Sequence, residues 1–171
     1  MIRAVTAADA PALAAIYNPY ITSTVITFET VEVSAADMAA RVERITGLGL
    51  PWLVLEEQGE VIGYAYAGPF KERAAFAHTL ETSIYLHQGR GGGGRGRRLY
   101  DALLDALMAL TKAESVVAPV HVLVAGIALP NEPSVALHEG HGWTKVAHFE
   151  QVGFKLGRWV DVGYWQLTLG A

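Results

Sequence analysis

The sequence predicts a single α/β domain over residues 1–171, built on a mixed sheet. Short apolar runs alternate with segments of helical periodicity, and the later part reads as two strands, strand–loop–helix, strand–helix and two strands. Apolar residues make up 51% of the chain and charged residues 18%, which is enough for a sizeable core at this length. Neither an internal repeat nor a linker divides the sequence.

The first helix is predicted from its start and its stop. Thr6 and Asp9 are spaced as a capping box, so a helix is expected over Ala7–Tyr17. Proline disfavours helical geometry in the residue before it, so Asn18-Pro19 is expected to end this helix. The β-branched and aromatic stretch that follows, Tyr20–Glu29, is expected to be extended or loop-like.

The remaining elements follow from apolar periodicity and from capping and turn residues. Ser34 with Asp37, and Asn131 with Pro133, open helices, and Gln58-Gly59 separates the strands of a hairpin. The expected strands are Ile2–Val5, Pro51–Glu57, Glu60–Ala67, Leu80–His87, His121–Ile127, Lys145–Phe154 and Arg158–Leu169. The expected further helices end at Gly47, at about Leu110 and at about Gly140, and the connections are Gly68–His78 and Thr111–Val120.

The stretch Leu80–Leu104 combines an apolar strand, a glycine-rich loop and the start of a helix. Its loop, Gln88–Gly96, holds six glycines and two arginines. Glycines let main-chain N–H groups converge on an oxyanion, which the positive end of the helix also faces. Four arginines, at positions 90, 95, 97 and 98, add positive charge. This stretch therefore predicts a site for a ligand that carries a diphosphate.

Two other phosphate-binding loops do not fit this stretch. No Lys-Ser or Lys-Thr pair follows the glycines, as a P-loop requires. Arg95 interrupts the spacing of a dinucleotide-binding loop, and the strand lies near residue 80 rather than at the start of a βαβ unit. A glycine–arginine segment that contacts RNA is the rival. The net charge of −4 argues against a nucleic-acid binder and favours a small polyanion.

Composition excludes several classes of site and of location. The chain has no cysteine, which excludes disulfides, thiolate metal sites and cysteine nucleophiles. The six histidines show no spacing of metal ligands, so no metal is expected. No run of about 18 apolar residues and no signal-like N-terminus is present. We therefore expect a cytoplasmic protein that does not enter a membrane.

Gly94-Arg95-Gly96, directly before the helix, resembles the acetyl-CoA loop of the GNAT acyltransferases, whose pattern is Gln/Arg-x-x-Gly-x-Gly/Ala. Further stretches resemble the phosphinothricin N-acetyltransferases of this superfamily, in the same order. They are YNPYITSTVITFET (17–30), PWLVLEEQGEVIGYAYAGPFKER (51–73), ETSIYLH (81–87), GRGRRLYDALL (94–104), AGIALPNEPSVALHEGHGW (125–143) and QVGFKLGRWVDVGYWQL (151–167). The resemblance implies the GNAT acyl-CoA N-acyltransferase fold, a twisted mixed sheet flanked by helices, with acetyl-CoA as co-substrate.

The resemblance also implies acetyl transfer to the amine of a small amino-acid-like acceptor, phosphinothricin or methionine sulfoximine. Glu81 would be the general base, and an acid on an apolar strand beside the anion loop agrees, because desolvation raises a carboxyl pKa. A solvated carboxylate paired with Lys71 or Arg73 is the alternative. His138 would assist proton movement or contact the acceptor, and Tyr100 would protonate the leaving thiolate. Packing in the core is the alternative for both.

The resemblance further implies contacts to both substrates. Neighbouring strands would splay, and main-chain N–H groups would hold the thioester and the pantetheine arm at Ile84, Tyr85 and Leu86. The diphosphate would contact Gly92, Gly93, Gly94, Arg95, Gly96 and Arg97. Asn131 matches a pantetheine-contacting asparagine, or only caps its helix. The acceptor contacts would be Phe28, Tyr66, Lys71, Arg73 and Phe76. The cations would bind an anionic group and the aromatics would form walls, with a solvated charge run and core packing as alternatives.

Other functions remain open at this point. The protein is expected to act by direct transfer in a ternary complex, without nucleic acid or membrane as a partner. An N-acetyltransferase for a protein N-terminus or an aminoglycoside is one alternative, and a non-catalytic acyl-CoA sensor is another. The family resemblance implies a homodimer, for which the long C-terminal strands with Trp159 and Trp165 would supply an interface or, alternatively, internal core.

Overall fold

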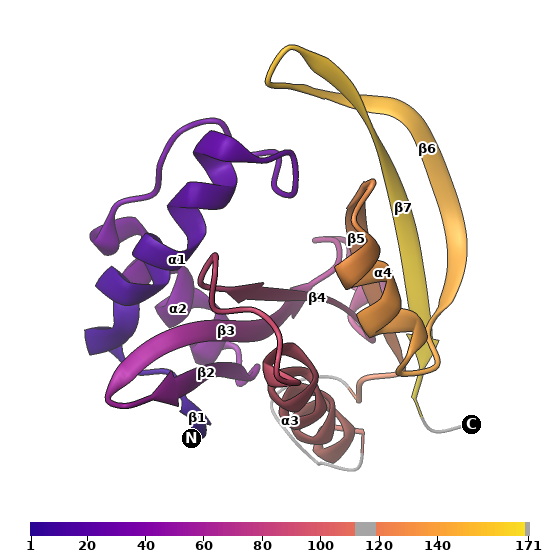
Figure 1. Cartoon of the computed structure of the whole chain (residues 1–171). Coiled ribbons are helices and arrows are strands. Elements are labelled where there is room, and N and C mark those ends of the chain that lie inside the picture. Colours follow the sequence, from indigo (N-terminus) through magenta and orange to yellow (C-terminus); the bar gives the residue numbers. More distant parts are fainter. Residues whose placement is uncertain (112–118, 170–171) are drawn as a thin grey trace.

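The computed structural model describes residues 1–111 and 119–169, in which one seven-stranded sheet carries helices on both faces (Figure 1). The strand order is β1-β2-β3-β4-β5-β7-β6, and every neighbouring pair is antiparallel except β4 with β5. The strands are β1 (Ile2–Ala4), β2 (Trp52–Glu57), β3 (Glu60–Pro69), β4 (Thr79–Leu86), β5 (Val122–Leu129), β6 (Thr144–Lys155) and β7 (Arg158–Thr168). The predicted mixed α/β sheet is confirmed.

Two pairs of helices cover the two faces of this sheet (Figure 1). On one face lie α1 (Ala10–Ser23) and α2 (Ala35–Gly47), and on the other lie α3 (Arg95–Ala109) and α4 (Glu132–Glu139). Apolar side chains at helical spacing point from the helices to the sheet and are buried. They include Leu13, Ile16 and Ile21 of α1, Met38, Val42 and Ile45 of α2, and Leu99, Leu103 and Leu107 of α3. The apolar face predicted for α2 is confirmed.

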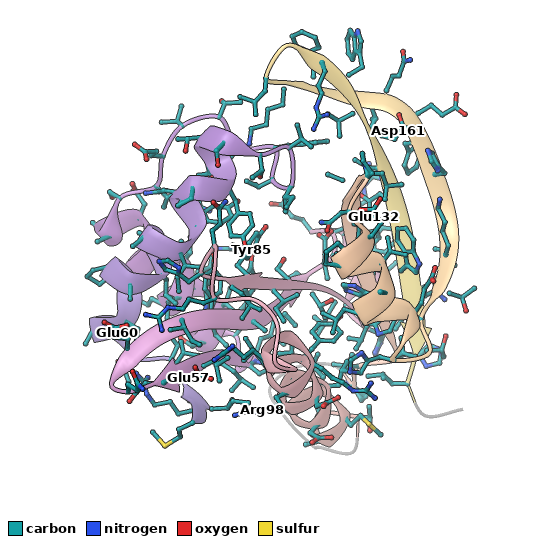
Figure 2. The ribbon with its side chains drawn as sticks, in the orientation of Figure 1. Glu57, Glu60, Tyr85, Arg98, Glu132 and Asp161 are labelled. Carbon is teal, nitrogen blue, oxygen red and sulfur yellow. The ribbon has the colours of Figure 1, made fainter. Side chains whose placement is uncertain are left out.

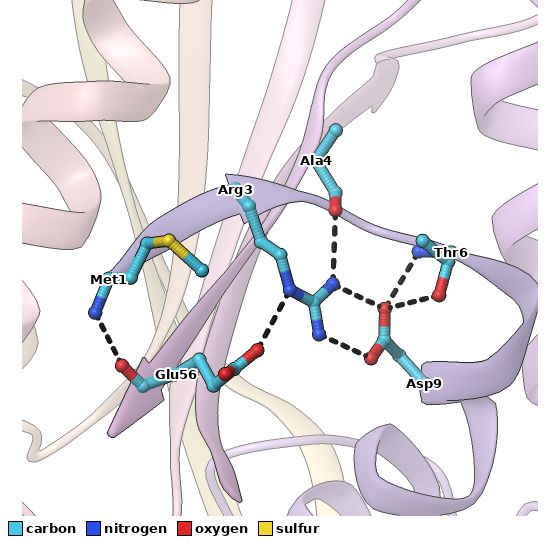
Figure 3. A network of polar contacts seen from close by, with 6 residues as sticks. All are labelled: Met1, Arg3, Ala4, Thr6, Asp9 and Glu56. Atoms are coloured by element: carbon cyan, nitrogen blue, oxygen red, sulfur yellow. Dashed lines mark hydrogen bonds and ion pairs between the residues drawn. The ribbon is translucent and has the colours of Figure 1, made fainter. Parts of the chain in front are cut away.

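The N-terminus is fixed to the sheet by a polar network around Arg3 (Figure 3). The Arg3 guanidinium pairs with Asp9 at 2.8 Å and with Glu56 of β2 at 2.9 Å. Asp9 also accepts a hydrogen bond from the Thr6 N–H at 2.7 Å, in agreement with the predicted capping box. The hydrogen bonds from Arg3 are the main cause that lowers the pKa of Asp9 to about 2. A 3-10 turn, Ala7–Asp9, precedes α1.

The predicted end of the first helix at Asn18-Pro19 is wrong, because α1 continues through the proline to Ser23. Tertiary contacts outweigh the N–H group that the proline lacks. The Asn18 side chain exchanges two hydrogen bonds with the main chain of Val33, at 2.9 and 3.0 Å, and Ile21 in the last turn is buried. Only the part of the predicted extended stretch that follows Ser23 is irregular.

The other caps and connections mostly lie where the sequence pattern places them. Ser34 accepts a hydrogen bond from a main-chain N–H in the first turn of α2 at 3.0 Å, and Asn131 does so for α4 at 3.3 Å. β3 continues to Pro69, just past the predicted start of the connection Gly68–His78. Most of the predicted connection Thr111–Val120 lies outside the described residues. No helix within the described ranges is long and apolar enough to cross a bilayer.

The β6–β7 hairpin extends beyond the rest of the sheet, and its tip turns toward the segment after α1 (Figure 1). Lys155 at this tip is buried, and its ammonium donates to the carbonyls of Thr27 at 2.6 Å and Tyr20 at 3.3 Å. Trp165 belongs to the core, whereas Trp159 is 62% exposed. Of the two tryptophans considered for an interface, only Trp159 therefore lies on the surface.

Candidate active site

The candidate site lies where the central strands β4 and β5 separate. The two strands pair in parallel over three residues only, and the last pair is Glu81 with Val124. β4 nevertheless continues to Leu86 beside β3, and β5 continues to Leu129 beside β7. The expected splay of neighbouring strands is thus observed. Beyond Glu81, the facing main-chain groups of the two strands have no ladder partner in the described chain, so a ligand can use them.

Two cavities meet at this gap. The first, here called the loop cavity, has a volume of about 440 Å³ and lies between the glycine loop, α4, β4 and β5. The second, here called the hairpin cavity, has a volume of about 510 Å³ and lies between β4, β5, the segment 26–28 and the β6–β7 hairpin. The residues shared by both walls are Ile26, Ser83, Tyr85, Gly126 and Ala128.

Strand alternation shows that the loop cavity passes through the sheet. Side chains alternate between the faces of a strand, and the loop cavity touches both sets on β4, from Thr82 to Leu86. The hairpin cavity touches only the set of Glu81, Ser83 and Tyr85, on the face that α1 covers. Tyr85, labelled in Figure 2, lies where the two cavities meet.

Glu81 combines a raised pKa with a position at this junction. Its carboxylate lines the hairpin cavity, and Oε1 lies 3.4 Å from the position that a Cβ would take at Gly126, a residue of both walls. Burial raises the pKa of Glu81 above the ordinary value of 4.5, and the positive charge of Lys71 acts in the opposite direction. A carboxylate with a raised pKa is suited to accept a proton during catalysis.

The glycine loop turns the chain into α3 and exposes main-chain donors. Residues 92–94 are glycines with φ of 87°, 58° and 73°, a region that favours glycine. The first N–H of α3 with an acceptor one turn back is that of Arg98, which donates to the Gly94 carbonyl at 2.9 Å. Within the described chain, the N–H groups of Gly96 and Arg97 before it have no main-chain acceptor and are available to a ligand. Such groups bind anions. Of the predicted diphosphate contacts, the loop cavity wall includes Gly92, Gly94, Arg95 and Gly96, whereas Gly93 and Arg97 lie in the same turn.

Two of the four arginines near the loop are neutralised by the β2–β3 hairpin. Arg95 donates to Glu57 through Nε and Nη2 at 3.0 to 3.1 Å, and Arg90 pairs with Glu60 at 3.1 Å. Figure 2 labels both glutamates, on the hairpin beside the start of α3. The expectation that all four arginines add charge to the anion site therefore needs correction. Arg95 lines the loop cavity, and its side chain holds the loop to Glu57 of β2.

The residues predicted to hold the thioester and the pantetheine arm line the loop cavity. Ile84, Tyr85 and Leu86 do so on β4, beyond its last parallel pair. Asn131 lies in the same wall and also caps α4, so the two alternatives for this residue are compatible. The hydroxyl of Tyr20 donates to the Leu86 carbonyl at 2.6 Å, which ties the end of β4 to α1.

The two predicted proton-transfer residues differ in their access to the cavities. His138 lines the loop cavity, and its Nδ1 donates to the Ser134 carbonyl at 2.7 Å, so Nε2 carries the lone pair. Burial lowers the pKa of His138, which favours the neutral ring. Tyr100 is fully buried outside both walls, and it contacts the loop cavity wall through a 2.9 Å hydrogen bond to Thr82 and through its ring, which packs edge-on against His138 with centroids 5.0 Å apart. Burial also raises the pKa of the Tyr100 hydroxyl.

The described residues contain no cluster of side chains that is typical of a metal site. No group of three or more His, Asp or Glu side chains there is arranged to hold an ion. The metal-free site stays a prediction.

Of the predicted acceptor contacts, only Phe28 lines the hairpin cavity. Its ring packs on Gly153 of β6, where an added Cβ would lie 2.5 Å from the ring. Tyr66 is instead stacked on Trp52, with ring centroids 4.1 Å apart, and Phe76 packs edge-on against Phe70. Among the described residues, neither Tyr66 nor Phe76 lines one of the two cavities.

The two predicted acceptor-binding cations lie on the exposed connection after β3. Lys71 and Arg73 belong to neither wall among the described residues. The Lys71 ammonium lies 4.8 Å from the ring centroid of Phe70, and its charge lowers the pKa of Glu81. Lys71 is therefore near enough to act on the Glu81 end of the hairpin cavity.

Most of the hairpin cavity wall had no role assigned from the sequence. A bulge in β6 between Phe149 and Gly153 changes the alternation, so that Phe149 and Val152 line the same cavity. Strand alternation alone predicts that Val162 and Tyr164 share a face, but no local pattern shows that this face meets Glu81. The unassigned wall residues are Ile26, Thr27, Ser83, Gly126, Ala128, Phe149, Val152, Val162 and Tyr164.

Comparison with known proteins agrees with this geometry. The acetyltransferase (GNAT) domain family matches residues 2–163. The phosphinothricin N-acetyltransferase of Streptomyces viridochromogenes is 40% identical over 165 residues, which cover 96% of this chain and 85% of that protein. The L-methionine sulfoximine/L-methionine sulfone acetyltransferase of Salmonella typhimurium is 38% identical over 168 residues, 98% of this chain and 94% of that protein.

A solved structure extends this agreement to three dimensions. A GNAT superfamily phosphinothricin acetyltransferase from Sinorhizobium meliloti, in complex with AcCoA, matches with a TM-score of 0.91 and 36% identity, over 99% of this chain and 88% of that chain. The resemblance drawn from the sequence motifs is confirmed, and so is the fold that it implied. The chain belongs to the GNAT acetyltransferase family.

Proposed function

We propose that this protein transfers the acetyl group of acetyl-CoA to the amine of phosphinothricin, methionine sulfoximine or a similar small amino-acid-like acceptor, with Glu81 as general base. The observation that carries the proposal is the Glu81 carboxylate at the junction of two cavities, on the last paired residue before β4 and β5 separate. The names of the relatives described above include such acceptors, phosphinothricin and methionine sulfoximine. One cavity is suited to the cofactor and the other to the acceptor.

The loop cavity has the features of a cofactor site. The diphosphate would bind the N–H groups at the N-terminus of α3, with the exposed Arg97 and Arg98 nearby. The pantetheine arm would follow the open edge of β4 past Asn131 and bring the thioester to the junction. Free N–H groups on that edge would polarise the thioester carbonyl and stabilise the oxyanion that forms on attack.

The hairpin cavity would present the amine to the thioester. Glu81 would take a proton from the acceptor ammonium, directly or through a water, and the nitrogen lone pair would then attack the carbonyl carbon. The C–S bond then breaks, the nitrogen loses a second proton to give the amide, and the thiolate takes up one proton as it leaves along the loop cavity. His138 lines that route and would move a proton there, whereas Tyr100 would act through the wall residues that it contacts, Thr82 and His138. Because the two cavities are joined, direct transfer in a ternary complex needs no acyl-enzyme.

The anionic group of the acceptor would face outward from the hairpin cavity. Among the described residues its wall is mostly apolar, and Glu81 is its charged member. A buried carboxylate or phosphinate there would be repelled by Glu81, whereas at the mouth it would meet Lys71 and Arg73. Lysine offers a point charge and arginine a bidentate fork.

The test is thiol release from acetyl-CoA with phosphinothricin, methionine sulfoximine and a panel of plain amino acids. Wild type should turn over at least one of the first two, and Glu81→Gln should lose about 10²- to 10⁴-fold in kcat. Glu43→Gln, an exposed glutamate of α2, is the matched control and should keep full activity. Turnover only with a protein N-terminus or an aminoglycoside would move the acceptor to another class. CoA binding without any turnover would indicate a sensor.

We also propose that the protein is a homodimer that uses the β6–β7 hairpin. Exposed contiguous apolar surface commonly marks an interface. The apolar side chains that are more than half exposed on this hairpin are Val146, Val152, Phe154, Leu156 and Trp159. Sedimentation should give twice the chain mass of 18.4 kDa, and Trp159→Lys should shift it toward the monomer. A wild-type mass of one chain at micromolar concentration would contradict the dimer.

A further inference from the structure

Tyr164 of β7 folds its ring over Gly126, its partner across the β5–β7 pair. A Cβ at Gly126 would lie 3.2 Å from Cε1 and 3.4 Å from Cζ of this ring, and 3.4 Å from Oε1 of Glu81. The hydroxyl-bearing end of the tyrosine and the carboxylate thus approach the same point from two different strands. Glycine at this position leaves the space between them open, and that space belongs to the junction of the two cavities.

The position and the protonation of Tyr164 are both well defined. Its ring meets Phe149 of β6 edge-on, with centroids 5.8 Å apart and planes at 89°, and this contact helps to hold the ring in place. Burial is the main cause that raises the pKa of Tyr164, and the negative charge of Glu81 adds to it. The hydroxyl therefore stays neutral at working pH, and it can donate one hydrogen bond and accept others.

The cavity that Tyr164 lines decides which substrate it meets. It belongs to the wall of the hairpin cavity, whereas the described wall of the loop cavity does not include it. The thioester sulfur would arrive through the loop cavity, so protonation of the thiolate is not the role that this position favours. The acceptor amine, in contrast, would lie in the hairpin cavity, whose wall includes both Tyr164 and Glu81.

We infer that Tyr164 is a further catalytic residue, whose hydroxyl oxygen accepts a hydrogen bond from the acceptor amine while Glu81 removes its proton. This inference rests on the proposed function. The ammonium gives one proton to Glu81, one remaining N–H points at the tyrosine oxygen, and the freed lone pair is thereby aimed at the thioester carbonyl. No proton is transferred to or from Tyr164. Positive charge that develops on nitrogen during attack strengthens this hydrogen bond.

Tyr164→Phe tests the inference, because it removes only the hydroxyl and keeps the ring over Gly126 and against Phe149. With acetyl-CoA saturating and the acceptor varied, kcat/KM for the acceptor should fall about 10-fold or more. The KM for acetyl-CoA should change by less than about twofold, since the ring lies outside the loop cavity wall. Tyr64→Phe is the matched control, since this buried tyrosine lines neither cavity among the described residues.

Each outcome decides the inference. A Tyr164→Phe enzyme with the kcat/KM of wild type would show that the ring is only a wall and would overturn the role of the hydroxyl, while the proposed function would stand. A rise in KM for acetyl-CoA without an effect on the acceptor would overturn it as well. Wild type without turnover on any amino-acid-like acceptor would overturn the proposed function, and this inference with it. Equal melting temperatures of variant and wild type are the check on folding.

Discussion

The loop cavity and the hairpin cavity have similar volumes, about 440 and 510 Å³, but their outer parts are built in different ways. The diphosphate end of the loop cavity depends on the main chain of one contiguous segment, the glycine loop and the first turn of α3, which ion pairs hold to β2 and β3, and the rest of its wall comes mainly from β4, β5 and α4. The hairpin cavity depends on side chains from β4, β5, β6, β7 and the segment after α1.

This difference matches the demands on the two substrates. A main-chain cradle binds the same diphosphate whatever side chains surround it, so it suits a cofactor that a whole family shares. A wall of side chains from distant segments can be altered by single substitutions, so it suits an acceptor that differs between relatives. Variants should therefore separate cofactor binding from acceptor binding, except at the junction that both cavities share.

The largest effect is expected at that junction, from Gly126→Ala. The added Cβ would lie within 3.4 Å of both the Tyr164 ring and the Glu81 carboxylate, so at least one of them must move. A displacement of about 1 Å in a reacting group can cost about 100-fold in rate, and the contacts at Gly126 require a shift of a few tenths of an ångström, so we expect a loss of kcat of about 10-fold. Thiol release from acetyl-CoA with saturating acceptor measures it.

Gly47→Ala is the control for this change. Gly47 ends α2, and an added Cβ there meets no atom within 4 Å. It should leave kcat unchanged. A Gly126→Ala enzyme that keeps kcat within about twofold of wild type would contradict the placement of the reacting groups at the junction. The two cavities would then not deliver their substrates to this point.

Lys155→Met should have the next largest effect. It should change the binding of the acceptor in the hairpin cavity and leave the binding of acetyl-CoA in the loop cavity unchanged. The buried ammonium joins the hairpin tip to the carbonyls of Thr27 and Tyr20, and its loss leaves a buried carbonyl without a donor. We expect a loss of about 1–3 kcal/mol in the free energy of unfolding and a higher KM for the acceptor, because Thr27 lines that cavity. Urea unfolding and acceptor kinetics measure the two effects.

Lys145→Met, on the same strand but exposed, should change the stability by less than about 0.5 kcal/mol. If Lys155→Met raised the dissociation constant of acetyl-CoA as much as the KM of the acceptor, the two cavities would not be independent.

Glu57→Gln should have a smaller effect, on the loop cavity. It weakens the ion pair that holds the Arg95 side chain at 3.0 Å, so the glycine loop becomes less ordered. The pair is only partly buried, and we expect the dissociation constant of acetyl-CoA to rise only about two- to fivefold, less at high salt. Calorimetric titration with acetyl-CoA measures it. Glu60→Gln, which touches the more exposed pair with Arg90, should change it less, and equal effects of both variants would contradict a special role for Glu57.

The diphosphate end of the loop cavity was largely predictable because the residues of the glycine loop and of the first turn of α3 are adjacent in sequence. Six glycines between a strand and a helix are enough to indicate an anion site, and residues 92–94 do adopt the left-handed backbone that only glycine adopts easily. The side-chain pairing of Arg95 with Glu57 was not predictable, because it joins residues 38 positions apart. Local pattern also failed at Pro19, where contacts of the Asn18 side chain with a later segment keep the helix intact.

The hairpin cavity was much less predictable for a physical reason. Its wall is assembled by strand register, and register between distant strands leaves no local trace in sequence. Gly126 faces Tyr164 only because β5 pairs with β7 in this register, and Phe149 joins the wall only through a bulge in β6. Glu81 was identifiable because an acid on an apolar strand is unusual in itself. Tyr66 was matched to the acceptor by family position, and this role stays a prediction, because its ring stacks on Trp52 while its hydroxyl is hydrogen-bonded to Ser83 of both walls.

The smallest effect should be a shift in pH dependence caused by Lys71→Met. Glu81 acts as a base only when deprotonated, and burial raises its pKa, so kcat/KM should rise with pH through a value above the ordinary 4.5. The charge of Lys71 lowers that pKa, and its removal should therefore move the acid limb to higher pH.

Arg73→Met is the matched control, because Arg73 is not among the groups that shift the pKa of Glu81. Both variants should raise the KM of an anionic acceptor, but only Lys71→Met should move the limb. A limb that stays in place in Lys71→Met would mean either that Glu81 is not the titrating base or that Lys71 does not face it. The pH profile of Glu81→Gln separates these two explanations, because the residual activity of this variant lacks the limb only if Glu81 is the titrating base.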